Sequence, residues 1–204
     1  WRNAEWVIAA FALLVIPVVA LFFKNSPLDA NTTPYGGTVD DIPNKPPVTL
    51  KANFAVISQA AKTKAFWALA ATFFVCGWTT NGLIGVHFIP AAHDHGMPVT
   101  MAAGLLATVG IFDFVGTILS GWLTDRFNPA VLLVIYYGLR GVALFSVPFV
   151  LGPDIEPPLW FFVFFYGLDW IATVPPTVEL CRRYFGLTNS PIVYSWVFVS
   201  HMVG

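Results

Sequence analysis

The chain has 204 residues, of which 57% are hydrophobic and only 10% are charged, and its mean hydropathy is +0.72. Soluble domains carry about 25% charged residues, so this composition excludes an ordinary soluble domain and indicates a membrane protein. The formal net charge of −1 offers no basic surface for nucleic acid. Cys76 and Cys181 lie in or beside apolar stretches, with a spacing that favours neither a disulfide framework nor a metal site.

Five apolar runs are long enough to cross a bilayer, which requires about 20 helical residues. Backbone groups in lipid must be hydrogen-bonded within the segment, so each run is predicted to be an α-helix; the alternation typical of a membrane β-barrel is absent from the sequence. The runs cover about 3–23, 65–90, 99–123, 130–151 and 158–179, and a shorter one begins near 191. We predict an all-α membrane protein, a helical bundle fragment with five complete transmembrane helices and a truncated sixth. Because the chain opens on Trp1 rather than Met, we expect it to be part of a longer protein.

The segment between the first and second runs, 25–63, differs from the rest in being polar and rich in proline. This composition predicts a linker without much regular structure, with a short amphipathic helix from Leu50 to Ala61. The linker also holds Lys45, Lys51, Lys62 and Lys64 at or near its C-terminal end.

Lys and Arg alternate between the connections in a way that predicts the orientation of the helices. Positive residues near helix ends stay on the cytoplasmic side. They occur in the linker, in the third connection at Arg126 and in the fifth at Arg182 and Arg183, whereas the connections at 93–96 and 152–158 have none. We therefore expect residue 1 outside the cell and the linker in the cytoplasm.

The third connection reads G-W-L-T-D-R-F-N-P, from Gly121 to Pro129, and is predicted to be a tight cytoplasmic hairpin, with Gly121, Asp125 and Arg126 as a gating loop. Gly121 permits a close approach of two backbones, and Asn128 tolerates a left-handed turn conformation. Asp125 can accept hydrogen bonds near the positive end of the next helix, and Pro129 suits its first turn.

The same residues carry a family resemblance. Gly121, Leu123, Asp125 and Arg126 match the loop signature G-x-L-a-D-r-x-G-r-r, so the chain resembles the major facilitator superfamily (MFS), although Asn128 replaces the second glycine. Trp1-Arg2 is similar to the W-R found just before the sixth helix of that family. The resemblance implies that 1–24 is helix 6, 25–63 is the cytoplasmic linker between the halves, and 64–204 contains helices 7 to 10 and the start of 11.

The resemblance implies secondary active transport of a small solute by alternating access, in a multi-pass protein of the cell membrane, the inner membrane in a bacterium. The expected partners are the solute, protons, the lipid bilayer and the missing N-terminal half; no cofactor, metal, nucleic acid or enzymatic activity is expected. Phe112-Asp113 is similar to carriers of monocarboxylates and other organic anions, although Thr117 stands where they carry an Arg. The alternatives are a drug or other small-solute exporter, a non-transporting sensor and an intramembrane enzyme.

Asp113, Arg140 and Asp169 lie near the middles of three consecutive predicted spans. A charge at the centre of a membrane helix costs about 2.5–3.5 kcal/mol on insertion scales, so each needs a partner or a function. We predict that they meet in one layer, with Thr117 and Tyr137 beside them, as a substrate or proton site. The alternative is a fixed ion pair in which Arg140 merely neutralises one of the two acids.

Three further features have two interpretations each. Asn81, with Thr79 and Thr80, lines a polar cavity or bonds to neighbouring helices. Pro175-Pro176 forms a hinge or a static kink. His93 and His95 in an exposed turn are more typical of a solvated loop than of a metal site.

Overall fold

The computed structural model describes residues 2–24, 26–33, 38 and 49–204. Trp1 and most of the predicted linker lie outside the described residues. The chain divides into two compact units, Trp1–Pro46 and Pro47–Gly204. The first unit contains helix α1, Arg2–Phe22, and a short 3₁₀ helix, Leu28–Ala30.

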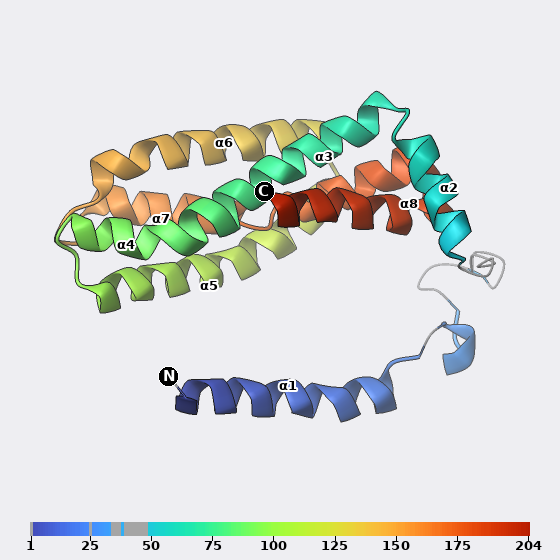
Figure 1. Cartoon of the computed structure of the whole chain (residues 1–204), viewed down its shortest axis with the longest axis horizontal. Helices are drawn as coiled ribbons and strands as arrows, with labels where there is room; N and C mark the ends of the chain where they lie inside the picture. Colours follow the sequence, from blue (N-terminus) through green and yellow to red (C-terminus); the bar gives the residue numbers. More distant parts are fainter. Residues whose placement is uncertain (1, 25, 34–37, 39–48) are drawn as a thin grey trace. The chain divides into compact units, whose positions relative to one another are not determined.

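The second unit is a helical bundle (Figure 1). Its α-helices are α2 (Leu50–Ala60), α3 (Lys64–Gly77), α4 (Val86–Asp94), α5 (Val99–Thr124), α6 (Pro129–Val150), α7 (Pro157–Asp169) and α8 (Val174–Val203). A π-helical segment, Trp78–Gly85, joins α3 to α4. Across both units, the described residues contain no strand and five helical stretches that are long and apolar enough to cross a membrane. The predicted fold class is therefore confirmed.

The helix starts follow from local capping. The Thr49 and Thr63 hydroxyls accept hydrogen bonds from backbone N–H groups in the first turns of α2 and α3. Asn128 does the same for α6, where its Oδ1 accepts from Ala130 N at 2.9 Å, and Pro129 occupies the first turn as predicted. Asn128 itself has φ −68°, so the expected left-handed turn is wrong, and Asn128 rather than Asp125 caps α6.

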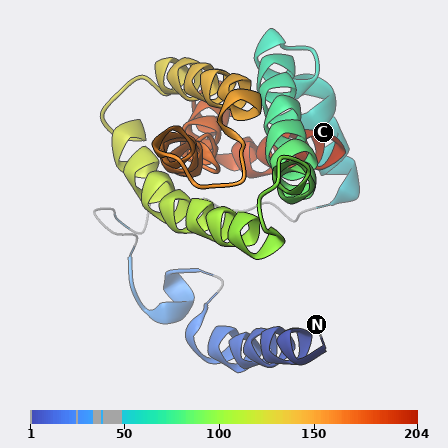
Figure 2. The same cartoon turned by 90° about the vertical axis from the view of Figure 1, so that its left-hand side faces the viewer.

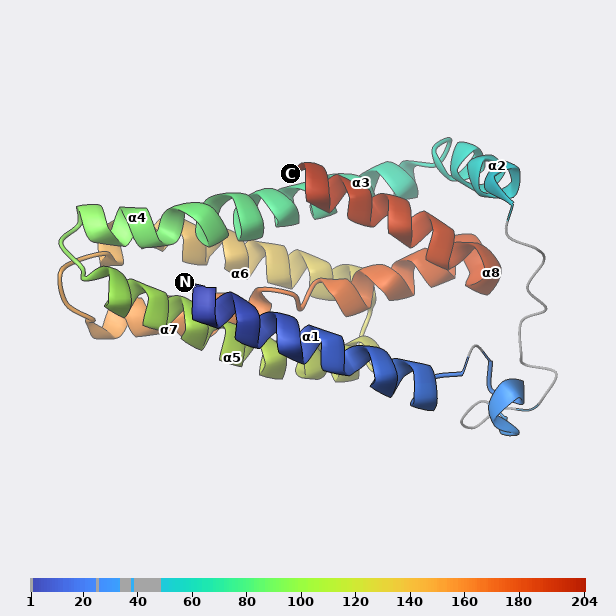
Figure 3. The same ribbon diagram turned by 60° about the horizontal axis from the view of Figure 1, so that its bottom comes forward.

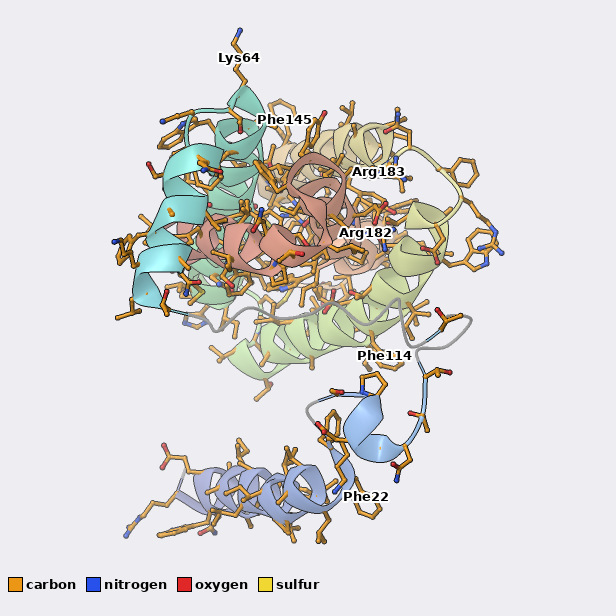
Figure 4. All side chains as sticks on the ribbon, turned by 90° about the vertical axis from the view of Figure 1, so that its right-hand side faces the viewer. Phe22, Lys64, Phe114, Phe145, Arg182 and Arg183 are labelled. Carbon is orange, nitrogen blue, oxygen red and sulfur yellow. The ribbon has the colours of Figure 1, made fainter. Side chains whose placement is uncertain are left out.

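The bundle has its connections at two ends, seen in Figure 1. The hairpin between α5 and α6, which contains Arg126, lies toward the same end as α2 and the bend of α8, where Figure 4 places Arg182 and Arg183. The connections 95–98 and 151–156 lie at the opposite end. The cationic connections therefore gather at one end of the bundle, whereas the two without Lys or Arg gather at the other.

Helix α7 occupies the middle of the bundle. The end-on view in Figure 2 shows it enclosed by α4, α5 and α6, and these helices share one apolar core that includes Phe88, Leu105 and Phe162. A second core joins α3 and α8 around Phe73 and Val197. On the outside, aromatic side chains project away from the bundle, as Phe114 and Phe145 do in Figure 4, which fits a surface in contact with lipid.

Glycines bring α5 and α7 into backbone contact. A β-carbon at Gly116 would overlap the carbonyl of Leu168, and one at Gly167 would lie 2.9 Å from the carbonyl oxygen of Val109. Small residues at such crossings are typical of membrane helices, where packing rather than the hydrophobic effect drives association. Nothing lies within 4 Å of a β-carbon at Gly121, so the close approach expected there is wrong.

The stretch predicted as one span over 158–179 is broken. Helix α7 ends at Asp169, and α8 begins at Val174 with Pro175 and Pro176 in its first turn. A proline lacks the N–H that would bond to the carbonyl four residues earlier and also clashes with it, so the helix cannot continue back across this point. Residues 170–173 form a turn between the two helices, and the prolines start α8 rather than kinking a continuous helix.

Helix α8 consists of two limbs joined at Gly186, whose φ of +77° falls in the left-handed region. Figure 3 shows the limbs running in nearly opposite directions. The sequence predicted a connection between the fifth span and a sixth beginning near 191; the structure reduces that connection to a bend at one glycine, for which the lack of a side chain is the physical reason.

Candidate functional site

Arg140 of α6 is the centre of the candidate site. The residue is only 2% exposed, and its Nε donates to Oδ2 of Asp169, at the end of α7, over 2.6 Å. Asp169 is 5% exposed. The two side chains form a buried, charge-assisted pair between neighbouring helices. In such a pair the attraction offsets the cost of removing both charges from water only when the hydrogen-bond geometry is good.

The guanidinium also binds the main chain where α7 ends. Its Nη2 donates to the carbonyl oxygens of Asp169 at 2.6 Å and Trp170 at 3.0 Å. The last carbonyls of a helix have no partner within it and carry its partial negative charge, so a cation stabilises them. Arg140 therefore donates hydrogen bonds both to the Asp169 carboxylate and to the last carbonyl groups of α7.

The third nitrogen connects Arg140 to α3 and the π-helical segment. Nη1 donates to Cys76 Sγ at 3.0 Å and lies 3.5 Å from Thr79 Oγ1. The guanidinium carbon also lies 5.5 Å from the centre of the Tyr137 ring, one helical turn earlier on α6. Nearly every face of the guanidinium thus has a partner within the bundle.

Asp113 of α5 reaches the same break from another helix. Its Oδ1 accepts from the backbone N–H of Ile171 at 2.9 Å and from Thr117 Oγ1 at 3.3 Å. The carbonyl of Trp170 and the N–H of Ile171 belong to one peptide group, which therefore has Arg140 at its oxygen and Asp113 at its nitrogen. We call this group the clamped peptide.

The structure brings together most of the predicted site residues. Arg140 pairs with Asp169, and the clamped peptide links Arg140 to Asp113. Thr117 supports Asp113, whereas the Tyr137 hydroxyl donates to the Thr72 carbonyl at 2.7 Å. Asn81 is exposed and contacts none of the charged residues.

The sequence analysis missed the role of Cys76 and the π-helical geometry, although it singled out Thr79 and Thr80 beside Asn81. The thiol of Cys76 contacts both Arg140 and the Thr173 hydroxyl, the latter at 3.6 Å. Thr80 Oγ1 donates to the Cys76 carbonyl at 2.7 Å, and the Tyr166 hydroxyl donates to that of Thr79 at 2.9 Å. The π turn places these polar groups beside Arg140, and such turns occur often at functional sites. The predicted polar group Thr79-Thr80 lies one turn after Cys76, and this spacing was the available signal for the thiol.

Other residues singled out in the sequence lie away from this site. Arg126 lies over the Trp122 ring at 4.1 Å and donates to the Trp122 carbonyl near the end of α5. Arg182 and Arg183 both pair with Glu179 and are about half exposed. No group of three metal-ligating side chains occurs within the described ranges.

Comparison with known proteins gives one family and one similar curated protein. Residues 1–204 match the family model described as Major Facilitator Superfamily. An uncharacterized MFS-type transporter, YcxA of Bacillus subtilis (strain 168), is 31% identical over 107 residues. This alignment covers 51% of the chain and 26% of the relative, about a quarter of its length. No solved structure shows significant similarity.

Proposed function

The chain belongs to the Major Facilitator Superfamily, and on that premise we propose that it is part of a secondary transporter that carries a small organic anion together with a proton. The family consists of multi-pass membrane transporters and not of enzymes, which removes the intramembrane enzyme from the alternatives. Residues 64–204 would supply helices 7 to 10 and the start of 11, and the linker 25–63 would lie in the cytoplasm. The collection of cationic connections at one end of the bundle supports this orientation.

The observation that carries the proposal is the buried ion pair in which Arg140 Nε donates to Asp169 Oδ2. A guanidinium binds carboxylates through parallel hydrogen bonds, so a carboxylate on a solute can take the place of the Asp169 side chain. Asp169 can leave Arg140 without becoming an unpaired buried charge only if it takes up a proton.

Charge balance then couples the two species. A proton alone would neutralise Asp169 and leave Arg140 unpaired, whereas an anion alone would add a second negative charge beside it. Either state buries an uncompensated charge, which costs several kcal/mol in a low-dielectric interior. One proton and one monoanion together keep the net charge of the site unchanged. We therefore expect a one-to-one ratio.

The clamped peptide gives the exchange a structural consequence. Arg140 binds the Asp169 carboxylate and the main chain of the break through neighbouring nitrogens. A shift of the guanidinium toward a solute would change its bonds to residues 169–170 and hence the angle between α7 and α8. In this proposal the hinge is the turn 170–173, with Pro175 and Pro176 keeping the break in place.

The test is transport by the full-length protein in proteoliposomes. Counterflow of a panel of labelled monocarboxylates is measured with and without an inward proton gradient. Arg140→Gln is expected to abolish transport, and Asp169→Asn to retain exchange but lose stimulation by the gradient. Arg182→Gln removes an exposed cation while Arg183 keeps its bond to Glu179, and serves as the matched control.

Three results would contradict the proposal in different ways. Normal transport by folded Arg140→Gln and Asp169→Asn would mean that the pair is a fixed structural bridge. Proton-driven efflux of amphipathic cations, without carriage of anions, would favour the drug exporter. Binding of a solute without flux would favour a sensor.

A further inference from the structure

Helix α2 presents large apolar side chains that the bundle leaves uncovered. On its inner side, Val56, Ile57 and Ala60 pack into the core that joins α3 and α8. On another side, Leu50 and Phe54 lie one turn apart and are 79% and 61% exposed. Helices that combine such an apolar face with basic side chains are typical of segments that lie in a membrane interface.

The position of α2 fits this interpretation. Figure 1 shows α2 running across one end of the bundle, at a steep angle to α3, and Figure 4 shows it at the edge of that end. Residues 61–63 join α2 directly to the membrane-spanning helix that begins with α3. In the first turn of α3, the exposed Trp67 indole donates to the Ala61 carbonyl at 2.8 Å. Tryptophan is enriched where the bilayer meets water, so this bond places the end of α2 at that boundary.

The charges on and beside α2 have one sign. The sequence contains no Asp or Glu from 42 to 93, whereas Lys51, Lys62 and Lys64 are all exposed. Among the described residues, none of these three lysines forms an ion pair. Lys51 and Phe54 are three residues apart, so a charge and a ring share one side of the helix. Figure 4 shows Lys64 projecting away from the bundle, toward the position of surrounding lipid.

We propose that this surface, made of Leu50, Lys51, Phe54, Lys62 and Lys64, binds anionic phospholipids of the cytoplasmic leaflet. The apolar side chains enter the acyl region, and the three ammonium groups bind headgroup phosphates. Charge complementarity selects anionic over zwitterionic lipids, because each lysine near an anionic leaflet strengthens binding about fivefold. The choice of leaflet rests on the proposed orientation, whereas the binding itself does not depend on transport.

The test measures which lipids lie beside α2 in the full-length protein in nanodiscs. A fluorophore is attached through Ser58→Cys, an exposed position one turn after Phe54, with other exposed cysteines replaced by serine. Cys76 and Cys181 are buried and stay in place. The nanodiscs contain phosphatidylcholine and phosphatidylglycerol in equal amounts, and one or the other lipid carries bromine, which quenches the fluorophore on contact.

We expect stronger quenching by brominated phosphatidylglycerol than by brominated phosphatidylcholine. Replacing Lys51, Lys62 and Lys64 with Gln should remove this preference, each change lowering it by up to about fivefold. Replacing the same three residues with Arg keeps the charge and should keep the preference. High salt should weaken it, because salt screens exposed charges.

The opposite results overturn the proposal. Equal quenching by the two lipids with the lysines intact, or a preference that survives the three Gln changes, excludes recognition of anionic headgroups. Quenching by aqueous iodide but by neither lipid means that α2 lies in water, and quenching by none of the three means that protein covers it. The measurement requires neither solute nor flux, so a protein that shows the lipid preference but transports no organic anion refutes the proposed function alone.

Discussion

Replacing Arg140 with Met separates the two structural roles of the guanidinium. Met replaces the apolar stem of Arg but has no donor, so Asp169 Oδ2 and the carbonyls of residues 169 and 170 lose their bonds together. Asp169→Leu removes only the carboxylate and leaves Arg140 bound to both carbonyls. The double variant removes both charges but still leaves the carbonyls without a donor.

The three variants are expected to differ by measurable amounts. Breaking a buried ion pair from one side costs about 3–5 kcal/mol because the other charge remains. Hydrogen bonds between membrane helices average about 0.6 kcal/mol, so the two carbonyls add about 1 kcal/mol and Arg140→Met costs about 4–6 kcal/mol. In the double variant the charge penalty disappears, and only a loss of about 1 kcal/mol remains.

The assay is thermal unfolding of the full-length protein in detergent, followed by the reaction of buried thiols with a fluorogenic reagent. Cys181 is fully buried and lies outside the Arg140 contacts, so its reaction reports unfolding of the bundle. The expected order of midpoints, from highest to lowest, is wild type, the double variant, Asp169→Leu and Arg140→Met. Equal midpoints for Arg140→Met and Asp169→Leu would refute the main-chain role of Arg140, because only Arg140→Met removes the donor to the two carbonyls.

Three other substitutions test the fold around the site. Gly116→Leu should prevent α5 from packing on α7, so that a detergent size-exclusion profile shows no folded protein. Gly121→Leu has open space around it and should give a normal profile. Equal profiles for the two variants would contradict the backbone contact between α5 and α7. Asp113→Leu should lower the unfolding midpoint more than Asp113→Asn, because only Asn keeps an acceptor for the Ile171 N–H, at a difference of about 1–3 kcal/mol. Asn128→Ala should cost about 0.5–2 kcal/mol through loss of the α6 cap and Asn128→Asp little, and equal midpoints for these two would exclude the capping bond.

The helices, and the depth at which Asp113, Arg140 and Asp169 lie, were predictable because the bilayer permits few backbone structures and few buried charges. A run of about 20 apolar residues must be helical, and a charge in its middle must be compensated. These constraints led from the sequence to Arg140 and its acids without knowledge of which acid pairs with it. The start of α6 was predictable for a different reason: proline lacks a backbone N–H, so Pro129 suits the first turn of a helix, where that group has no partner.

The break after Asp169 depends on contacts that the sequence does not display. Pro175-Pro176 signalled an interruption, but the turn lies just upstream, at 170–173, where α5 and α6 supply Asp113 and Arg140 to the freed backbone groups. Gly116 and Gly121 illustrate the same limit. They are the same residue on the same helix, and only the position of α7 decides which one requires the absence of a side chain.

The amide between Trp170 and Ile171 is polarised by Arg140 at its carbonyl and by Asp113 at its N–H. Because both contacts are made by the main chain, they depend little on which side chains are encoded at 170 and 171. The groups that bind Arg140 and Asp113 are a carbonyl and an N–H that every residue except proline would supply at these positions. Ordinary codon changes at 170 and 171 therefore leave the electrostatic link between α5 and α6 intact. An ester bond in place of this amide, introduced with an α-hydroxy acid at 171, would remove the donor and reveal the link.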